Sequence, residues 1–119
     1  MSSPKKTIYS NSQYGQDLWV ATRLNAKKNG YFMEIGAGDG QWISNTLVLE
    51  RELGWTGLLV EPTSAYEQLV VNRPRSRCIN AVIASKRKEV TLCEIFDQGQ
   101  ADINGQAADN TLLSKVEET

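Results

Sequence analysis

The sequence predicts an α/β protein built around a parallel β-sheet, and two patterns carry that prediction. Short apolar segments typical of buried strands recur along the chain, and stretches with the three- to four-residue apolar spacing of helices separate them. Strands that alternate with helices are joined by parallel crossovers, which predicts the sheet order 3-2-1 for the first three strands. A glycine-rich turn follows the first strand, within YFMEIGAGDGQW at 31–42.

The first helix is predicted over about residues 12–28. Gly15 weakens its first turn and favours a start after that position, while Gly30 suits the position just beyond its C-terminus. The apolar stripe of this helix consists of Tyr14, Leu18, Ala21 and Leu24.

The remaining elements follow in chain order. Strands are predicted at 31–35, 58–61 and 78–84, and helices at 44–53 and 65–72. The apolar character of the second and third strands indicates that both faces of the sheet are covered. Alternation over 89–96 predicts a fourth, antiparallel strand, and the polar residues beyond it read as loop with a weakly helical end at 111–118.

These elements divide the chain into three parts. We expect an N-terminal tail at 1–11, an α/β cofactor-binding half-domain at 12–96, and a polar tail or the start of a further half at 97–119.

Composition excludes several classes of function. The net charge of −1 argues against nonspecific binding to nucleic acid or to acidic membranes. The chain has no histidine, so it lacks the commonest general base. No apolar run approaches the roughly 20 residues of a membrane span, and the N-terminus lacks the apolar core of a secretory signal. Cys78 and Cys93 lack metal-site spacing, so we expect a reduced, cytoplasmic protein.

The glycine-rich turn and one acid together indicate a nucleoside cofactor. Glycines permit positive φ and close approach of a ligand to the main chain, and the amides of the following helix favour anionic or polar groups. Glu61 ends the second strand, 21 residues after Gly40, where an acid can accept hydrogen bonds from ribose hydroxyls. The alternative is a tight turn beside a surface carboxylate.

Five segments carry a family resemblance: SQYGQD (12–17), GYFMEIGAGDG (30–40), SNT (44–46), LGWTGLLVEP (53–62) and NRP (72–74). The spacing E-x-G-x-G-x-G resembles motif I of S-adenosylmethionine-dependent methyltransferases and differs from the dinucleotide pattern G-x-G-x-x-G. Together the segments resemble the FkbM family of these enzymes, although the family often has Asn at the position of Gly38. The resemblance implies a Rossmann-like sheet and methyl transfer to a hydroxyl of a sugar, glycolipid or natural product.

The resemblance also implies roles for individual residues. The glycines line the methionine end of the cofactor, Glu34 organises the loop and reaches the methionine amino group through water, and Glu61 binds the ribose. The implied cofactor set is Glu34, Gly36, Ala37, Gly38, Asp39, Gly40, Ser44, Asn45, Glu61 and Pro62. Three lead-in residues could close over the same mouth: Gln13, Gln16 and Asp17.

Several of these residues also have a structural explanation. Ser44 suits a helix cap and Asp17 a first-turn acid. Trp19, Trp42 and Trp55 are expected to be packing anchors rather than adenine platforms. The sequence assigns no catalytic base.

The family pattern continues beyond what residues 97–119 match, so the chain resembles the first half of a methyltransferase, one that we expect to be inactive alone. The edge of the 31–35 strand then lacks a partner within the chain, which favours a homo-oligomer through that edge. Two alternatives remain: an NAD-type nucleotide-binding domain, and a non-catalytic interaction module.

Overall fold

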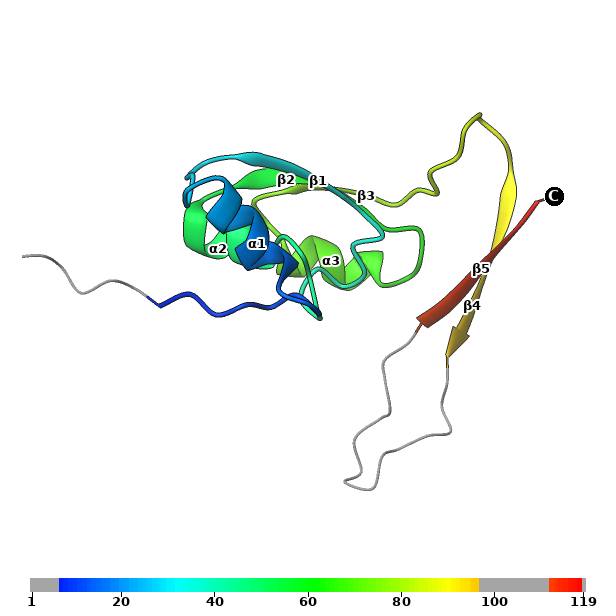
Figure 1. Ribbon diagram of the computed structural model, residues 1–119. Coiled ribbons are helices and arrows are strands. Elements are labelled where there is room, and N and C mark those ends of the chain that lie inside the picture. Colours follow the sequence, from blue (N-terminus) through cyan, green and yellow to red (C-terminus); the bar gives the residue numbers. More distant parts are fainter. Residues whose placement is uncertain (1–6, 97–111, 119) are drawn as a thin grey trace, which may run out of the picture. The chain divides into compact units, whose positions relative to one another are not determined.

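The computed structural model describes residues 7–96 and 112–118. The chain forms two compact units, Met1–Ile83 and Ala84–Thr119. The first unit contains, in order, α1 (Gln16–Arg23), β1 (Tyr31–Ile35), α2 (Leu47–Leu53), β2 (Thr56–Val60), α3 (Tyr66–Asn72) and β3 (Arg77–Ile79). Its strands form a parallel sheet in the order β1-β2-β3, which confirms the predicted order and the α/β class (Figure 1).

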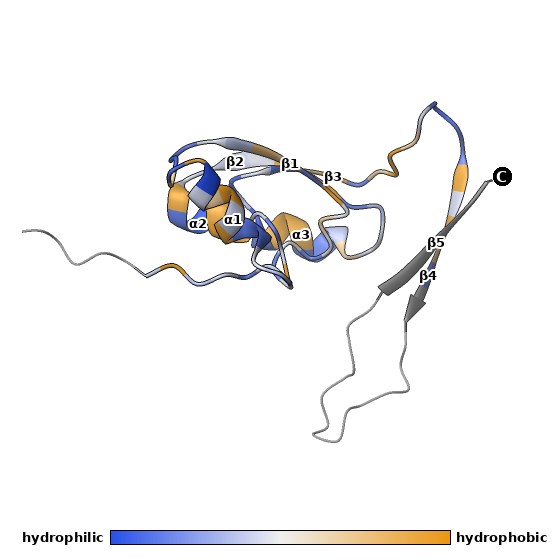
Figure 2. Ribbon diagram, viewed as in Figure 1, coloured by the Kyte–Doolittle hydropathy of each residue, from blue (hydrophilic) through white to orange (hydrophobic). Residues whose placement is uncertain are grey.

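All three helices of this unit pack on one face of the sheet (Figure 1), with apolar segments of the helices beneath the strands (Figure 2). Leu59 and Leu69 are fully buried between the two layers. The remaining buried members of the core cluster are Phe32, Ala37, Leu49, Leu53 and Trp55. Burial of such side chains is the main favourable term in folding, so this layer stabilises the unit.

The opposite face of β1 is open. Tyr31, Met33 and Ile35 point away from the helices and are 67%, 63% and 59% exposed, whereas Phe32 between them is buried. The predicted cover on both faces of the sheet is therefore missing along β1 in the described part of the first unit. On the same face of β2, however, Val60 is buried and Leu58 is half-buried.

α1 begins after Gly15, as predicted, but ends five residues earlier than the predicted end at residue 28. Asn25 and Ala26 adopt left-handed φ values of 53° and 54°, which stop the helix. Gly30 is not the helix cap, because α1 ends at Arg23 and its C-cap is Leu24. Gly30 is instead a packing position, since a Cβ there would lie 2.5 Å from the ring of Trp55. Trp55 is buried and donates from Nε1 to the carbonyl of Lys27 at 2.6 Å, as a packing anchor should.

Trp19 and Trp42 are exposed, so the expectation that they anchor the core is wrong. Trp19 instead stacks under the guanidinium of Arg23, 5.1 Å from the ring centre. The third strand is also shorter than predicted, ending at Ile79. Beyond it, the side-chain amide of Asn80 donates to the Glu61 carbonyl at 2.9 Å. This side chain therefore occupies a carbonyl that the backbone of a longer third strand would have bonded.

The second unit contains β4 (Val90–Phe96) and β5 (Leu112–Glu118), which pair antiparallel with Val90 opposite Glu118. The antiparallel strand at 89–96 is therefore confirmed. The helical end predicted at 111–118 is wrong, because pairing with β4 gives residues 112–118 interstrand hydrogen-bond partners that an isolated seven-residue helix could not match. Among the residues described, no helix is long and apolar enough to cross a bilayer.

Candidate functional site

The glycine-rich turn leaves the sheet at the carboxyl end of β1, beside the carboxyl end of β2. Gly36, Gly38 and Gly40 have φ values of 80°, 61° and 78°. These left-handed values cost an L-residue with a Cβ roughly 1–2 kcal/mol each, so glycine is required by the turn itself. The edge where strand ends meet a turn is where open α/β sheets bind ligands.

Glu61 lies across this edge from the turn. Its side chain is 5% exposed, and its Oε1 accepts a hydrogen bond from the Gly38 amide at 2.7 Å. Its Oε2 accepts from the Thr63 amide at 2.9 Å and from the Thr63 hydroxyl at 2.5 Å. The turn and the β2 end are thus joined by one carboxylate. Because each carboxylate oxygen has two lone pairs, Oε1 keeps capacity for one further donor.

The amides at the start of the turn face β2 rather than open space. The amides of Gly36 and Ala37 both donate to the Val60 carbonyl, at 2.8 and 3.0 Å, and the Gly38 amide donates to Glu61. The next helix, α2, begins only at Leu47 and has seven residues. The expectation that the amides of the following helix lie at this turn and favour anionic or polar groups is therefore wrong, because no helix starts there.

The three glycines do not share one role. No other group lies within 4 Å of the position that a Cβ would occupy on Gly36 or Gly38, so the main chain is open there. A Cβ on Gly40 would lie 2.6 Å from both Arg73 Cγ and Leu69 Cδ1. Gly40 therefore packs inward and does not line the open side, contrary to the expectation. Ala37 is likewise a core residue.

The two acids at and after the end of β1 shape the segment beyond the turn. Glu34 accepts from the Asn45 amide at 3.1 Å and from the Thr46 hydroxyl at 3.0 Å. Burial raises the pKa of Glu34, while those two hydrogen bonds and the charge of Arg73 act in the opposite direction. Asp39 closes the next turn, its Oδ1 accepting from the amides of residues 41 and 42 at 2.9 and 2.8 Å.

Sequence reasoning missed Arg73, which is fully buried. Its Nε pairs with Glu50 at 3.1 Å, Nη1 donates to the Gly40 carbonyl at 3.1 Å and to Ser44 Oγ at 3.0 Å, and Nη2 donates to Thr46 Oγ1 at 2.9 Å. The Arg73 network, defined as Arg73, Glu34, Gly40, Ser44, Thr46, Glu50 and Ser76, continues from Thr46 to Glu34 and from Glu50 to Ser76. It holds the glycine-rich turn against α2.

Ser44 belongs to this network rather than to an open edge. It is buried, and its Oγ accepts from the amides of Thr46 and Leu47 at 3.2 and 3.1 Å as well as from Arg73. Ser44 is therefore not the N-cap of α2, which is Thr46, but it closes the turn just ahead of that helix. Because Ser44 is buried in this network, it does not line an open cofactor edge. The only sequence signal for Arg73 was its membership of NRP, since an Arg before Pro in a turn normally lies at the surface.

Asp17 anchors the segment ahead of α1, and this segment reaches the glycine-rich turn through another residue, Asn11. Asp17 is fully buried and accepts from the Ser10 hydroxyl at 2.6 Å and from the amides of Asn11, Ser12 and Leu18. The side chain of Asn11 in turn donates to the Gln41 carbonyl at 2.7 Å. Asp17 is therefore not a mouth residue.

The other two lead-in residues and Pro62 lie nearer solvent. Gln16 accepts from the Tyr14 amide at 2.8 Å, and Gln13 is exposed ahead of the helix. Pro62 is half-buried, and its carbonyl accepts from Asn80 at 3.2 Å.

Replacing Asp17 with asparagine should lower the free energy of unfolding at pH 7 by about 1–3 kcal/mol. Burial raises the pKa of Asp17, but the hydrogen bonds from Ser10, Asn11, Leu18 and Ser12 outweigh it and hold this pKa below its ordinary value of 3.8. The ionised group therefore stabilises the fold above pH 3.8, and this contribution is lost as the pH falls through the lowered pKa. Urea unfolding should show a smaller difference near pH 3 than at pH 7.

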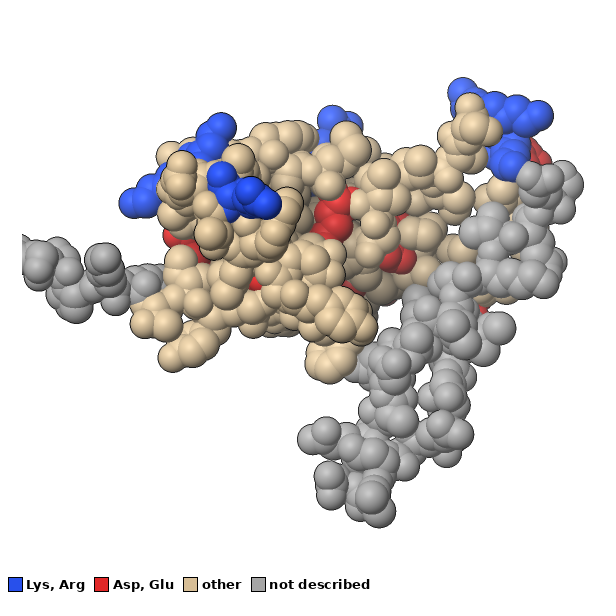
Figure 3. All heavy atoms as spheres, viewed as in Figure 1, with Lys and Arg blue, Asp and Glu red and all other residues tan. Residues whose placement is uncertain are grey.

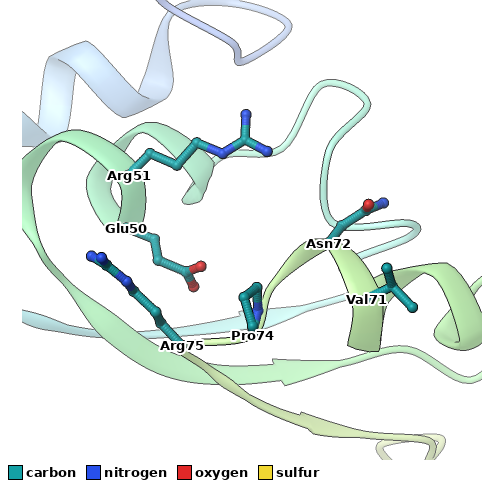
Figure 4. A pocket seen from close by; sticks show the side chains of 6 residues that line it. All are labelled: Glu50, Arg51, Val71, Asn72, Pro74 and Arg75. Carbon is teal, nitrogen blue, oxygen red and sulfur yellow. The ribbon is translucent and has the colours of Figure 1, made fainter.

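A hollow of about 400 Å³ lies elsewhere, between α2 and the end of α3 (Figure 4). It is lined by Glu50, Arg51, Val71, Asn72, Pro74 and Arg75, none of which belongs to the predicted site. Within residues 7–96 and 112–118, no group of three His, Cys, Asp or Glu side chains is arranged to hold a metal ion. The hollow is thus lined by other residues than the predicted cofactor set, although the Asn72 side chain also donates to the Asp39 carbonyl of the turn at 2.9 Å.

Charge is separated along β1. Lys27 and Lys28 are exposed just before the strand, while Glu34, Asp39 and Glu61 lie at the other end of the sheet. On the visible face of the first unit, acidic side chains show near the middle and basic side chains at the margin (Figure 3). The charged groups around the turn are thus these three carboxylates and the buried guanidinium of Arg73, which donates to the Gly40 carbonyl.

No family model matches the sequence, and no curated protein matches it. One similar solved structure is a SAM-dependent methyltransferase from Geobacter sulfurreducens, determined in complex with S-adenosyl-L-homocysteine. The identity is 13% and the TM-score 0.46, over 64% of this chain and 32% of that one, so this chain spans about a third of its length.

Proposed function

We propose that the first unit binds S-adenosylmethionine at the glycine-rich turn, as the cofactor half of an FkbM-type O-methyltransferase. The observation that carries the proposal is the 2.7 Å hydrogen bond from the Gly38 amide to Glu61, which places an acid beside an open glycine at two adjacent strand ends. The proposed acceptor is a hydroxyl of a sugar, glycolipid or natural product. The family assignment is based on the segments 12–17, 30–40, 44–46, 53–62 and 72–74.

The charges near the turn favour this cofactor over a dinucleotide. A pyrophosphate needs free amides or a helix N-terminus, and here the first three amides of the turn already donate to β2 or to Glu61. S-adenosylmethionine instead carries a sulfonium and an ammonium group, which suit the carboxylates of Glu61 and Asp39. The NAD-type alternative is therefore less consistent with this turn.

The proposal gives each side chain a limited task. The bound cofactor supplies an electrophilic methyl group. Glu61 accepts a hydrogen bond from a ribose hydroxyl on the second lone pair of Oε1. The absence of a Cβ on Gly36 and Gly38 allows the cofactor to approach the main chain closely. Glu34 and the Arg73 network fix the position of the turn, which is the positioning that an in-line transfer requires.

Calorimetric titration of S-adenosylhomocysteine into the full chain tests the proposal, and Glu61→Ala should weaken binding about 10- to 100-fold, because a charge-assisted hydrogen bond is lost. Glu67→Ala, an exposed acid on α3, is the matched control and should bind as the wild type does. Circular dichroism should confirm that each variant is folded at the titration temperature.

Two outcomes would contradict the proposal. Tighter binding of NADH than of S-adenosylhomocysteine would favour the NAD-type domain. No binding of either ligand by a folded chain would favour a non-catalytic interaction module.

A further inference from the structure

Three successive carbonyls of the glycine-rich turn, those of residues 39–41, each accept a hydrogen bond from a side chain that is remote in the sequence. The donors are Asn72, Arg73 and Asn11, which bond to Asp39, Gly40 and Gln41 at 2.9, 3.1 and 2.7 Å, respectively. Asn72 is the last residue of α3, whereas Asn11 precedes α1. The end of the turn is therefore fixed by two separate segments of the first unit.

The start of the turn is fixed in a different way, through its amides. The amides of residues 36–38 donate to Val60 and Glu61, at and just after the end of β2. Glycine loses more conformational freedom on ordering than any other residue, so a turn with three glycines needs such bonds to keep one conformation. A ligand that had to order the turn itself would bind more weakly, because ordering costs entropy.

Asn11 and Asn72 differ from Arg73 in what else they support. Arg73 is fully buried and bonded to several other members of its network, so its loss affects the core. Among the described residues, the side chains of Asn11 and Asn72 donate hydrogen bonds to the turn alone, and both residues are half-buried. The main chain of Asn11 is itself held, because its amide donates to the buried Asp17 at 2.7 Å. The hydrogen bonds of the two asparagine side chains therefore act on the turn rather than on the core.

We propose that Asn11 and Asn72 are positioning residues that hold the glycine-rich turn in its ligand-binding conformation before the ligand arrives. The inference rests on the cofactor site proposed above, and each asparagine acts through a carbonyl of the turn rather than by contact with the cofactor. Their bonds keep the open main chain of Gly36 and Gly38 in one conformation. The entropic cost of ordering the turn is then met during folding rather than on binding, which raises the affinity for the cofactor.

Amide hydrogen exchange of the free, full chain tests the positioning without any ligand. Asn72→Leu and Asn11→Leu nearly retain the side-chain volume but remove the donor, so each should speed exchange of the Gly40 amide, which closes the turn, about 3- to 10-fold. The amide of the buried Leu59 in β2 reports opening of the whole unit and should change less. Gln68→Leu, at an exposed position on α3, is the matched control and should leave both rates unchanged. A Gly40 amide that exchanges as in the wild type in both asparagine variants would overturn the proposal.

Calorimetric titration of S-adenosylhomocysteine into the same variants tests whether the positioning serves the cofactor site. Each asparagine variant should bind about 3- to 10-fold more weakly than the wild type, with a more unfavourable binding entropy, while Gln68→Leu should bind as the wild type does. Bonds with a structural role alone would lower the denaturant midpoint and leave the affinity unchanged, and that result would overturn the proposal. A wild-type chain that binds no S-adenosylhomocysteine would instead contradict the cofactor site, and the exchange rate of Gly40 would still decide whether the asparagines hold the turn.

Discussion

Replacing Arg73 with methionine should lower the free energy of unfolding of the first unit by about 3–5 kcal/mol. The guanidinium is fully buried and bonded to Glu50, Gly40, Ser44 and Thr46. Removing it leaves the Glu50 carboxylate buried without its cation, and removing one partner of a buried pair costs more than the pair contributes. Urea unfolding followed by circular dichroism measures the loss.

Arg75→Met is the matched control for this prediction, because Arg75 lies two residues away and is exposed. That variant should change stability by less than about 0.5 kcal/mol. Arg73→Lys keeps the charge but loses the planar fork, so it should fall between the two. Adding Glu50→Leu to Arg73→Met should recover part of the loss. Equal stability of Arg73→Met and Arg75→Met would contradict the role assigned to the network.

Replacing Gly40 with alanine should destabilise the first unit by about 2–5 kcal/mol. A Cβ at this position meets Arg73 and Leu69 at 2.6 Å, and the φ of 78° is strained for alanine. Both costs arise together, because the turn cannot move away from Arg73 without breaking the bond to the Gly40 carbonyl. Thermal or urea unfolding measures the effect.

Gly38→Ala provides the contrast, since its φ of 61° is also left-handed but no group lies within 4 Å of the added Cβ. It should cost only the backbone term of about 1–2 kcal/mol. The added methyl should nevertheless weaken S-adenosylhomocysteine binding, because it occupies the open side of the turn. Equal destabilisation by both alanines would show that Gly40 is not a packing position.

The part of the fold that could be predicted is the part with a strong local signal. YFMEI, followed by glycines at alternate positions, indicated a strand and a left-handed turn, and both are present. Glu61 could be placed opposite the turn because parallel strands end at one edge. The strand order followed from the alternation of helices and strands alone.

The misplaced features depend on contacts that the local sequence does not encode. The family resemblance implied that Ser44 and Gly40 lie on the cofactor side, yet Arg73, 33 residues after Gly40, bonds to both and holds them inward. The local sequence of residues 112–118 predicts a weak helix, but these residues form a strand because they pair with β4, which lies far from them in the sequence. The end of α1 depends on left-handed Asn25 and Ala26, and nothing in their composition required that conformation.

The most direct test of the cofactor site is amide NMR of the full chain titrated with S-adenosylhomocysteine. The site at the β1 and β2 ends predicts saturable shifts for the amides of Gly36, Gly38 and Thr63, with little change at Arg51 and Val71 beside the α2–α3 hollow. Shifts confined to the residues of that hollow, or no shift at the turn under saturating ligand, would contradict the assignment of the glycine-rich turn as the cofactor site.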